Sequence, residues 1–512
     1  MCCCLSQLRG RFLSISQAYR ILNDSPYVEV RAVVPNTDDP KEACNTIRAW
    51  TIGLLLACFG ALINQLFSLR QPSIYMDQIV AQLLAYPLGR GWATWFPAIL
   101  SPKNPKFTRK EHMLITVMAN VSFHIDYASY VIVVQLAPTF FNQRWASNFG
   151  YQSTSNPLST LFSAFYVIFL AYYLYKDANI CFIVTLSLSF QLIGYGLAGL
   201  SRRFLVYPSS AVWPNNLATI ALNNSFHTNE NPVANGWKVS QFRFFLYAFI
   251  GMFVYFWFPN YIAVFLSAFS WISWIAPNNI KLAAITGSQS GLGLNPLPTL
   301  DWNVVRATGF PLISPFFSTV NNFMGMFLTF PIIVAIWFTN TWYTAYMPIN
   351  ANRPYDRFGA RYNVSSIVDE NGLFDKAAYE AYSPLYLSAS NAFIYGTYFA
   401  IYPATLVYVY LYHRREILSG FMSLFRRNRE RARVSDIHTR LMFQNYSEAP
   451  EWWFAVLLLF SIALGLIALL AYPTHATVGS LFMGILLAII FVVPIGSVLP
   501  PVFRLHPILT IY

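Results

Sequence analysis

The sequence predicts an all-α, polytopic membrane protein with about twelve transmembrane helices and one Gly/Pro-rich re-entrant segment. Of its 512 residues, 56% are hydrophobic and only 11% are charged, whereas soluble domains usually carry about 25% charged residues. Apolar segments long enough to cross a bilayer as helices recur throughout the chain. A third observation is the stretch 271–302, WISWIAPNNIKLAAITGSQSGLGLNPLPTLDW, in which an apolar helix is expected to break at Pro277.

The chain divides into a polar N-terminal tail (1–46), a multi-span membrane domain (47–498) and a divergent C-terminal end (499–512). The predicted spans are 47–69, 72–88, 112–135, 158–175, 178–197, 204–223, 244–258, 261–275, 316–338, 385–412, 453–472 and 478–498. Each is apolar enough to cross the bilayer as a helix, and the sixth contains a helix breaker, Pro214, followed by two amides.

The distribution of cations predicts which loops face the cytoplasm, because Lys and Arg accumulate in cytoplasmic loops. The loop 90–110 and the arginine-rich loop 413–450 are therefore expected inside, together with the N-terminal tail. The loop 339–384 is then extracellular and carries a glycosylation acceptor at Asn363. A second acceptor sequence, at Asn445, falls inside and should stay unmodified.

The same topology places two further features. Arg202 and Arg203 fall at the outer end of the sixth span, and the run 281–298 re-enters the membrane from the cytoplasmic side. Proline removes a backbone donor from a helix, and backbone freed at membrane depth must be buried in protein or line a wet cavity. Broken helices in transporters carry binding sites at such points, so the stretch around Pro277 indicates passage of a polar solute.

Ionisable side chains within membrane spans are costly and usually functional. The candidates for binding a coupling proton are Asp77, Glu111, His124 and Asp126. Histidine is suited to this role because its pKa lies near neutrality. The alternative is that these groups pair with one another or reach the interface.

A second set of polar residues is suited to peptide-like substrates, because arginine binds carboxylates and amides match both backbone donors and acceptors. The candidate substrate-binding residues are Asn120, Arg202, Arg203, Asn215, Asn216, Asn278, Asn279 and Lys281. The alternatives are interfacial anchoring for the arginines and satisfaction of the backbone freed by Pro214 and Pro277 for the amides.

The sequence contains no nucleotide-binding loop, metalloprotease motif or nucleophile elbow. We therefore expect no enzymatic activity, no metal and no cofactor, and energy must come from an ion gradient or a partner. The formal charge of +12 is spread over loops and does not form a basic face interleaved with aromatics, so nucleic acid is not an expected partner.

Several ordered motifs resemble the oligopeptide transporter family in its peptide-transporting branch, of fungal and plant type. The stretches that carry the resemblance are 25–40, 81–89, 110–122, 202–208, 213–217, 274–279, 290–294, 339–343 and 436–442. The resemblance implies proton-coupled symport of small oligopeptides, including glutathione-like peptides, across the plasma membrane. Its partners would be peptide, protons and the lipid bilayer.

The resemblance ends near residue 498, which predicts that the C-terminal part of such transporters is absent from this chain. Two alternatives follow. One is a non-transporting fragment that binds or regulates a full-length relative, and the other is a metal–chelator transporter of the same family.

Overall fold

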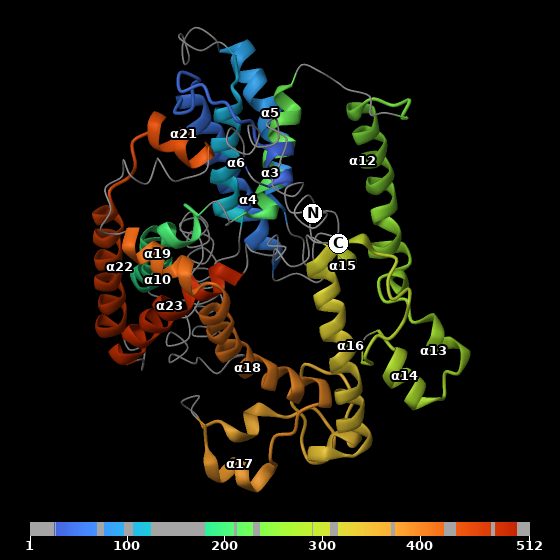
Figure 1. Cartoon of the computed structure of the whole chain (residues 1–512). Helices are drawn as coiled ribbons and strands as arrows, with labels where there is room; N and C mark the ends of the chain where they lie inside the picture. The colour runs from blue at the N-terminus through green and yellow to red at the C-terminus, as the bar shows by residue number, and fades with distance from the viewer. Residues whose placement is uncertain are drawn as a thin grey trace, which may run out of the picture. The chain divides into compact units, whose positions relative to one another are not determined.

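In the computed structural model, the regular secondary structure of the described residues consists of helices, as the sequence predicts (Figure 1). These residues are 25, 27–68, 76–96, 106–123, 180–208, 212–228, 236–288, 290–307, 316–369, 374–423, 437–472 and 477–498. Within them, β-pairing is limited to isolated bridges in the stretch 355–386. The chain forms two compact units, which we describe separately: unit 1 contains residues 1–227 and 408–512, and unit 2 contains residues 228–407.

A three-helix bundle forms the first part of unit 1, from α4 (Ile47–Ser68), α5 (Gln78–Trp95) and α6 (Arg109–Phe123). Its core contains Ala49, Ala85, Phe107 and Ile115, all buried. Because Ala49 and Ala85 are small, the helix backbones approach closely. The amide of Asn64, at one end of the bundle, donates to the main-chain oxygens of Met76 (3.0 Å) and Phe123 (2.7 Å) and so ties the three helices together.

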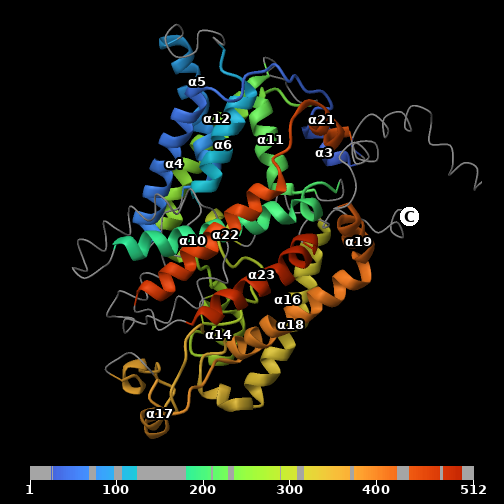
Figure 2. The ribbon, with the colours of Figure 1, turned by 90° about the vertical axis from the view of Figure 1, so that its left-hand side faces the viewer.

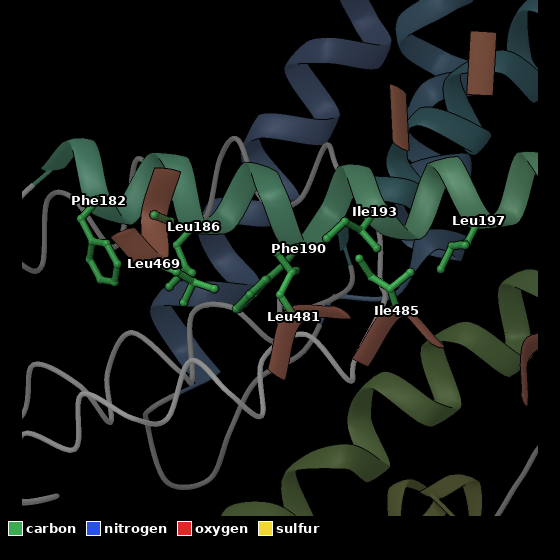
Figure 3. Packing of buried hydrophobic residues seen from close by; sticks show 9 residues of the cluster. Phe182, Leu186, Phe190, Ile193, Leu197, Leu469, Leu481 and Ile485 are labelled. Atoms are coloured by element: carbon green, nitrogen blue, oxygen red, sulfur yellow. The ribbon is translucent and has the colours of Figure 1, made fainter. Parts of the chain in front are cut away.

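The second part of unit 1 contains α10 (Ile180–Leu205), α22 (Glu451–Ala471) and α23 (Val478–Val498). Figure 3 shows how side chains spaced three to four residues apart along α10 pack against Leu469, Leu481 and Ile485. Helices α10 and α22 run antiparallel and touch closely, since a Cβ added at Gly196 would lie 2.7 Å from the Cβ of Leu458. The two helices lie side by side in both views (Figures 1 and 2).

Shorter helices complete unit 1. They are α3 (Val28–Val33), α11 (Pro214–His227), α19 (Arg414–Ser423) and α21 (Ile437–Asn445). Helix α11 begins at Pro214, which is favourable because the first helical residue needs no backbone donor.

Three long helices and a broken segment form unit 2. The long helices are α12 (Gln241–Trp257), α16 (Phe316–Phe338) and α18 (Ala389–Tyr412), the last of which continues into unit 1. The broken segment contains η3 (Phe258–Ile262), η4 (Val264–Leu266), α13 (Trp271–Ile275), α14 (Ile280–Thr286) and α15 (Trp302–Ala307). The loop between α16 and α18 contains η5 (Thr341–Tyr346), η6 (Val364–Ile367) and α17 (Lys376–Tyr382).

The helices confirm the predicted fold class, and two predicted spans, 316–338 and 478–498, coincide with α16 and α23. The count of twelve spans is not confirmed: among the described residues, seven helices are long and apolar enough to cross a membrane. The predicted fourth span, 158–175, lies outside the described residues.

Three predicted spans differ from the structure. The predicted sixth span, 204–223, is not one helix, because α10 continues to Leu205 and a new helix begins at Pro214. The predicted eighth span, 261–275, is broken into short helical pieces, and the second is shifted, since α5 begins at Gln78 and runs through Pro87 to Trp95.

Candidate functional site

A buried ion pair lies where α4 and α6 begin. The Nη2 atom of Arg48 is 2.6 Å from Oε2 of Glu111, and both side chains are fully buried. Glu111 also accepts from the Thr46 hydroxyl and from the backbone N–H of Thr108 at 2.9 Å, while its own N–H donates to the Thr108 hydroxyl at 3.1 Å. This reciprocal pattern is a capping box at the start of α6. Glu111 thus has structural partners on both oxygens, and its role in proton coupling stays a prediction.

A second contact joins two histidines from different helices, and the first of them, His112, directly follows Glu111 in sequence. His112, on α6, is fully buried, and its Nδ1 is 3.1 Å from Nε2 of His227, the last residue of α11. The Nε2 atom of His112 is 2.8 Å from the main-chain oxygen of Gln82 on α5. The two rings therefore connect three helices through side chains that can exchange protons.

Aromatic side chains surround the two histidine rings. Tyr86, Phe107 and Phe226 each have a ring centroid within 6 Å of the His112 ring centroid. His227 lies outside the seven candidate spans. Burial, and after it the neighbouring His112, Arg109 and Arg90, together lower the pKa of His227 to about 4. The pair is therefore expected to be neutral near pH 7.

One face of α11 supplies further polar groups to the same place. The Gln82 amide donates to the Thr219 main-chain oxygen at 2.9 Å, and the Asn223 amide donates to the Arg109 oxygen at 3.1 Å. Thr219, Asn223 and His227 are four residues apart and so share this face. We call Gln82, His112, Thr219, Asn223 and His227 the polar seam.

The polar seam contains acceptors without a partner. Within the described part of the chain, Oε1 of Gln82 and Oδ1 of Asn223 are buried and receive no hydrogen bond. Leaving a buried acceptor unsatisfied costs about 1–3 kcal/mol. Because buried polar groups in native proteins are nearly always paired, these two oxygens call for a specific explanation.

The segment before α4 is held against the ends of α6 and α11. Val33 accepts from the Asn224 amide at 2.7 Å, and the Lys110 ammonium forms an ion pair with Asp38 at 2.8 Å. The hydroxyl of Tyr446 donates to Asp38 at 2.6 Å and accepts from Lys110 at 2.7 Å. The tail, the start of α6 and the loop 413–450 thus meet in one cluster, which agrees with their predicted location on one side of the membrane.

Arg202 and Arg203 lie in the last turn of α10, against the start of α22. Arg202 donates to the Ala449 main-chain oxygen at 2.6 Å, and Arg203 forms an ion pair with Glu451. This contradicts their predicted place at an outer end, because residues 449–451 lie at the end of the loop 413–450, which was predicted inside. The discrepancy arises because α10 is longer than the predicted fifth span and the sixth is not continuous. Their role in binding a substrate carboxylate stays a prediction.

In unit 2, the stretch 264–300 runs out and back as an irregular hairpin. The Phe269 N–H donates to the Pro298 oxygen and the Leu300 N–H donates to the Leu266 oxygen, both at 2.8 Å. The amide of Asn295 donates to the Phe269 oxygen at 2.7 Å. The helix break at Pro277 is as predicted, and the freed backbone is satisfied largely within the hairpin.

The amides behind Pro277 and the nearby lysine surround an open hollow of about 620 Å³ that is lined by residues 276–281. Asn279 caps α14, since its Oδ1 accepts from the Leu282 N–H at 3.1 Å. Asn278 and Lys281 are exposed, and the Lys281 ammonium lies 5.8 Å from the ring centroid of Phe338. Asn279 thus satisfies backbone behind Pro277, which was the alternative to substrate binding. Asn278 and Lys281 are exposed in the hollow and could contact a ligand there.

The tip of this hairpin packs at the end of α16 from which the loop 339–384 begins. Ala284 and Leu292 pack against Ile333 and Ile349, and the Asn350 amide donates to the Gly291 oxygen at 3.1 Å. Gly291 is required there, because a Cβ would lie 2.5 Å from the Ala283 oxygen. The predicted re-entry of 281–298 from the side opposite to the loop 339–384 is therefore wrong: both lie at the same end of α16.

The remaining candidates are dispersed. Asn120 is half-buried on α6, Asp77 caps α5 by accepting from the Ile79 N–H at 3.0 Å, and Asn216 is exposed in the first turn of α11. The structure describes Asn215 only as part of that turn, and His124 and Asp126 lie outside the described residues. Asn363 and Asn445 are both exposed, so side-chain access does not distinguish the two acceptor sequences.

Sequence reasoning missed Arg48, Gln82, His112 and His227 as members of one site. The T-x-x-E pattern at 108–111, which is typical of a capping box, could have indicated the structural role of Glu111. No local pattern indicates the contact between His112 and His227, which are separated by 115 positions.

Among the described residues, seven helices are long and apolar enough to cross a bilayer, and they define an integral, multi-pass membrane protein. Comparison with known proteins identifies the family: the chain belongs to the OPT oligopeptide transporters, whose family model matches residues 44–499. This confirms the resemblance seen in the sequence. No solved structure matches the chain.

Curated relatives from two fungi match most of the chain, and two of the three described here are named as transporters. The chain is 38% identical to "Sexual differentiation process protein isp4" of Schizosaccharomyces pombe, over 94% of this chain and 58% of that protein. It is 32% identical to "Oligopeptide transporter 2" of Saccharomyces cerevisiae, over 92% of this chain and 52% of the relative. It is also 32% identical to "Glutathione transporter 1" of S. pombe, over 93% of this chain and 53% of that protein. The chain therefore spans between one half and three fifths of the length of these relatives.

Proposed function

We propose that this chain takes part in the proton-coupled transport of small oligopeptides, glutathione-like peptides among them, as a symporter. The observation that supports this most is the polar seam of this OPT family member, in which Gln82, His112 and Asn223 are buried and His112 contacts the half-buried His227. Amide oxygens can accept from peptide N–H groups, and imidazoles can take up and release protons.

The hollow at residues 276–281 is a second place where a peptide could be held. The exposed amide of Asn278 presents both a donor and acceptors, and Lys281 presents a cation for a peptide carboxylate. This part of the proposal belongs to unit 2 alone and is tested separately from the polar seam.

We also propose that the protein resides in the plasma membrane with its N-terminus in the cytoplasm. The cluster of Asp38, Lys110 and Tyr446 supports a common side for three basic or polar segments. Glycosylation mapping tests this orientation. Glycan on Asn363 with none on Asn445 is the expected result, and the reverse pattern contradicts it.

The transport proposal is tested by uptake of a labelled tetrapeptide or glutathione into cells that lack their own carriers and express this chain. We expect uptake to be faster from mildly acidic than from neutral medium and to be abolished by a protonophore. Correct insertion without uptake contradicts the proposal for this chain alone. Uptake that requires co-expression of a longer relative would indicate a non-transporting partner, and accumulation only of a metal–chelator complex would indicate the other branch of the family.

A further inference from the structure

The hydrogen positions in the histidine pair follow from its partners. The main-chain oxygen of Gln82 can only accept, so Nε2 of His112 carries a hydrogen. A neutral imidazole has one N–H, so Nδ1 of neutral His112 is an acceptor, and the hydrogen between the rings belongs to Nε2 of His227. The Nδ1 atom of His227 is then the one ring nitrogen of the neutral pair that carries no hydrogen and accepts none from the partner ring.

We infer that His112 and His227 form a single proton-binding site, which takes up one proton at Nδ1 of His227 when a peptide carboxylate binds nearby. The proton comes from water, and the product is one imidazolium shared by the two rings. The inference rests on the proposed peptide transport, because the peptide supplies the negative charge.

The groups that face the pair explain why it needs this charge. Arg109 and Arg90 are cationic, and Tyr86, Phe107 and Phe226 are uncharged. The acid next to His112 in sequence, Glu111, is already engaged by Arg48. Burial and the neighbouring cations keep the pKa of His227 at about 4, so the resting pair holds no extra proton near neutrality.

A carboxylate within about 4–6 Å favours the charged form of a histidine. By linkage, a peptide that raises the proton affinity is itself bound more tightly by the protonated site, by the same factor. Because proton and peptide strengthen each other's binding, a proton gradient can favour peptide binding on the more acidic side of the membrane.

The structure also supplies an acceptor for the new N–H. Asn223 precedes His227 by one turn of α11, and its Oδ1 is buried without a partner among the described residues. Asn223 and His227 share one face of α11, so this oxygen is the acceptor that we assign to the new N–H.

The test measures peptide affinity against pH on the purified chain in lipid nanodiscs, with tetra-alanine and its C-terminal amide as probes. For tetra-alanine we expect affinity to rise by about tenfold per pH unit on acidification below neutrality, the slope of one linked proton. The His227→Gln variant should lose this slope, as should the amidated peptide with the unchanged chain. His438→Gln, on α21, is the matched control and should keep it. An unchanged slope in His227→Gln overturns the inference.

A second measurement does not depend on peptide. Nitrogen NMR of isotope-labelled histidine should show His112 with hydrogen on Nε2 and one hydrogen between the rings, and acidification should add one proton to the pair. Two independent protonations, or hydrogen on Nδ1 of neutral His112, overturn the site. If the unchanged chain binds neither probe, the proposed peptide transport fails and the NMR result alone decides whether the proton site exists.

Discussion

The two units contain apolar helices of similar hydropathy but bury them to very different extents. In unit 1 the windows Ile47–Asn64 and Val184–Leu205 have mean hydropathies of 1.6 and 1.3 and are 50% and 56% buried. In unit 2 the windows Gln241–Ile262 and Phe316–Phe338 have values of 1.4 and 1.6 but are only 6% buried. Hydropathy therefore identifies a membrane helix without indicating whether protein or lipid covers it.

What distinguishes the two units is where their specific contacts lie. Unit 1 is held by small residues between helices and by buried polar pairs such as Arg48 with Glu111. In unit 2 the corresponding contacts are hydrogen bonds of irregular backbone, in the hairpin 264–300 and the loop after α16. Substitutions should therefore act on helix packing in unit 1 and on local order in unit 2.

The largest expected effect is from Arg48→Met, which leaves the Glu111 carboxylate buried without its cation. Breaking a buried pair typically costs about 3–5 kcal/mol, so we expect a strongly lowered unfolding temperature in nanodiscs. The matched control is Lys376→Met, whose ion pair with Glu380 is exposed and should contribute at most about 1 kcal/mol. Equal effects of the two substitutions would contradict the buried pair.

The next effect is from Gly196→Val, which separates α10 from α22. The added Cβ would lie 2.7 Å from Leu458 Cβ and 3.0 Å from its Cα, so the helices must move apart. Overpacking of this kind costs about 1–3 kcal/mol. Gly396→Val in α18 has nothing within 4 Å of the added atom and serves as the control. Unchanged thermal stability of Gly196→Val would show that the two helices do not pack as described.

A smaller and local effect is expected from Asn295→Ala in unit 2. The substitution removes the bond to the Phe269 oxygen and the acceptor for the Leu297 N–H, with a cost of about 1–3 kcal/mol for the unpaired groups. Amide hydrogen exchange should accelerate in 264–300 and stay unchanged in unit 1. Asn278→Ala, at an exposed position, should change neither. Faster exchange in α10 or α22 would show that a loss of local order in unit 2 also loosens the helices of unit 1.

The smallest effect concerns the cluster that holds the N-terminal segment. Partial burial would raise the pKa of Asp38, but hydrogen bonds from Lys110 and Tyr446 outweigh it and lower the pKa below its usual value of 3.8. Because the folded pKa is the lower one, the stabilisation is complete above about pH 4 and is lost as the pH falls through the folded pKa. We expect Asp38→Asn to cost about 0.2–1 kcal/mol at neutral pH.

Limited proteolysis of the segment 27–46 measures this effect. Cleavage should be faster in Asp38→Asn than in the unchanged chain at neutral pH, and the difference should disappear in strong acid. A difference that grows as the pH falls would contradict the sign derived for Asp38.

The sequence predicts the long helices well because their apolar length is a local property. Spans such as 316–338 could be placed to the residue although α16 contains Pro331, since membrane helices tolerate proline when neighbouring groups compensate. The break at Pro277 could be predicted because glycines and amides follow it. The irregular structure of the predicted eighth span could not be predicted, because its backbone hydrogen bonds are made with residues such as Pro298 and Leu300, which are distant in sequence.

The candidate site was predicted less completely than the fold. Glu111 was selected as an ionisable residue near a span, and its structural pairing depends on Arg48, 63 positions away. The histidine pair depends on α11 folding back onto α6, which no periodicity in either helix indicates. Residues that act through distant partners therefore require the tertiary structure, whereas those that end or cap a helix are already indicated by their neighbours.

The antiparallel contact between α10 and α22 has a consequence for synthesis and membrane insertion. The hydroxyl of Ser189 donates to the main-chain oxygen of Ser461, 272 residues later. At a translation rate of about 5–20 residues per second, α10 is made some 14–54 s before this partner exists. During that time its buried serines, Gln191 and the arginines of its last turn must be accommodated by the insertion machinery or by the bilayer. Slowed or arrested translation between the two helices should therefore expose α10 to quality control before the second half of unit 1 can form.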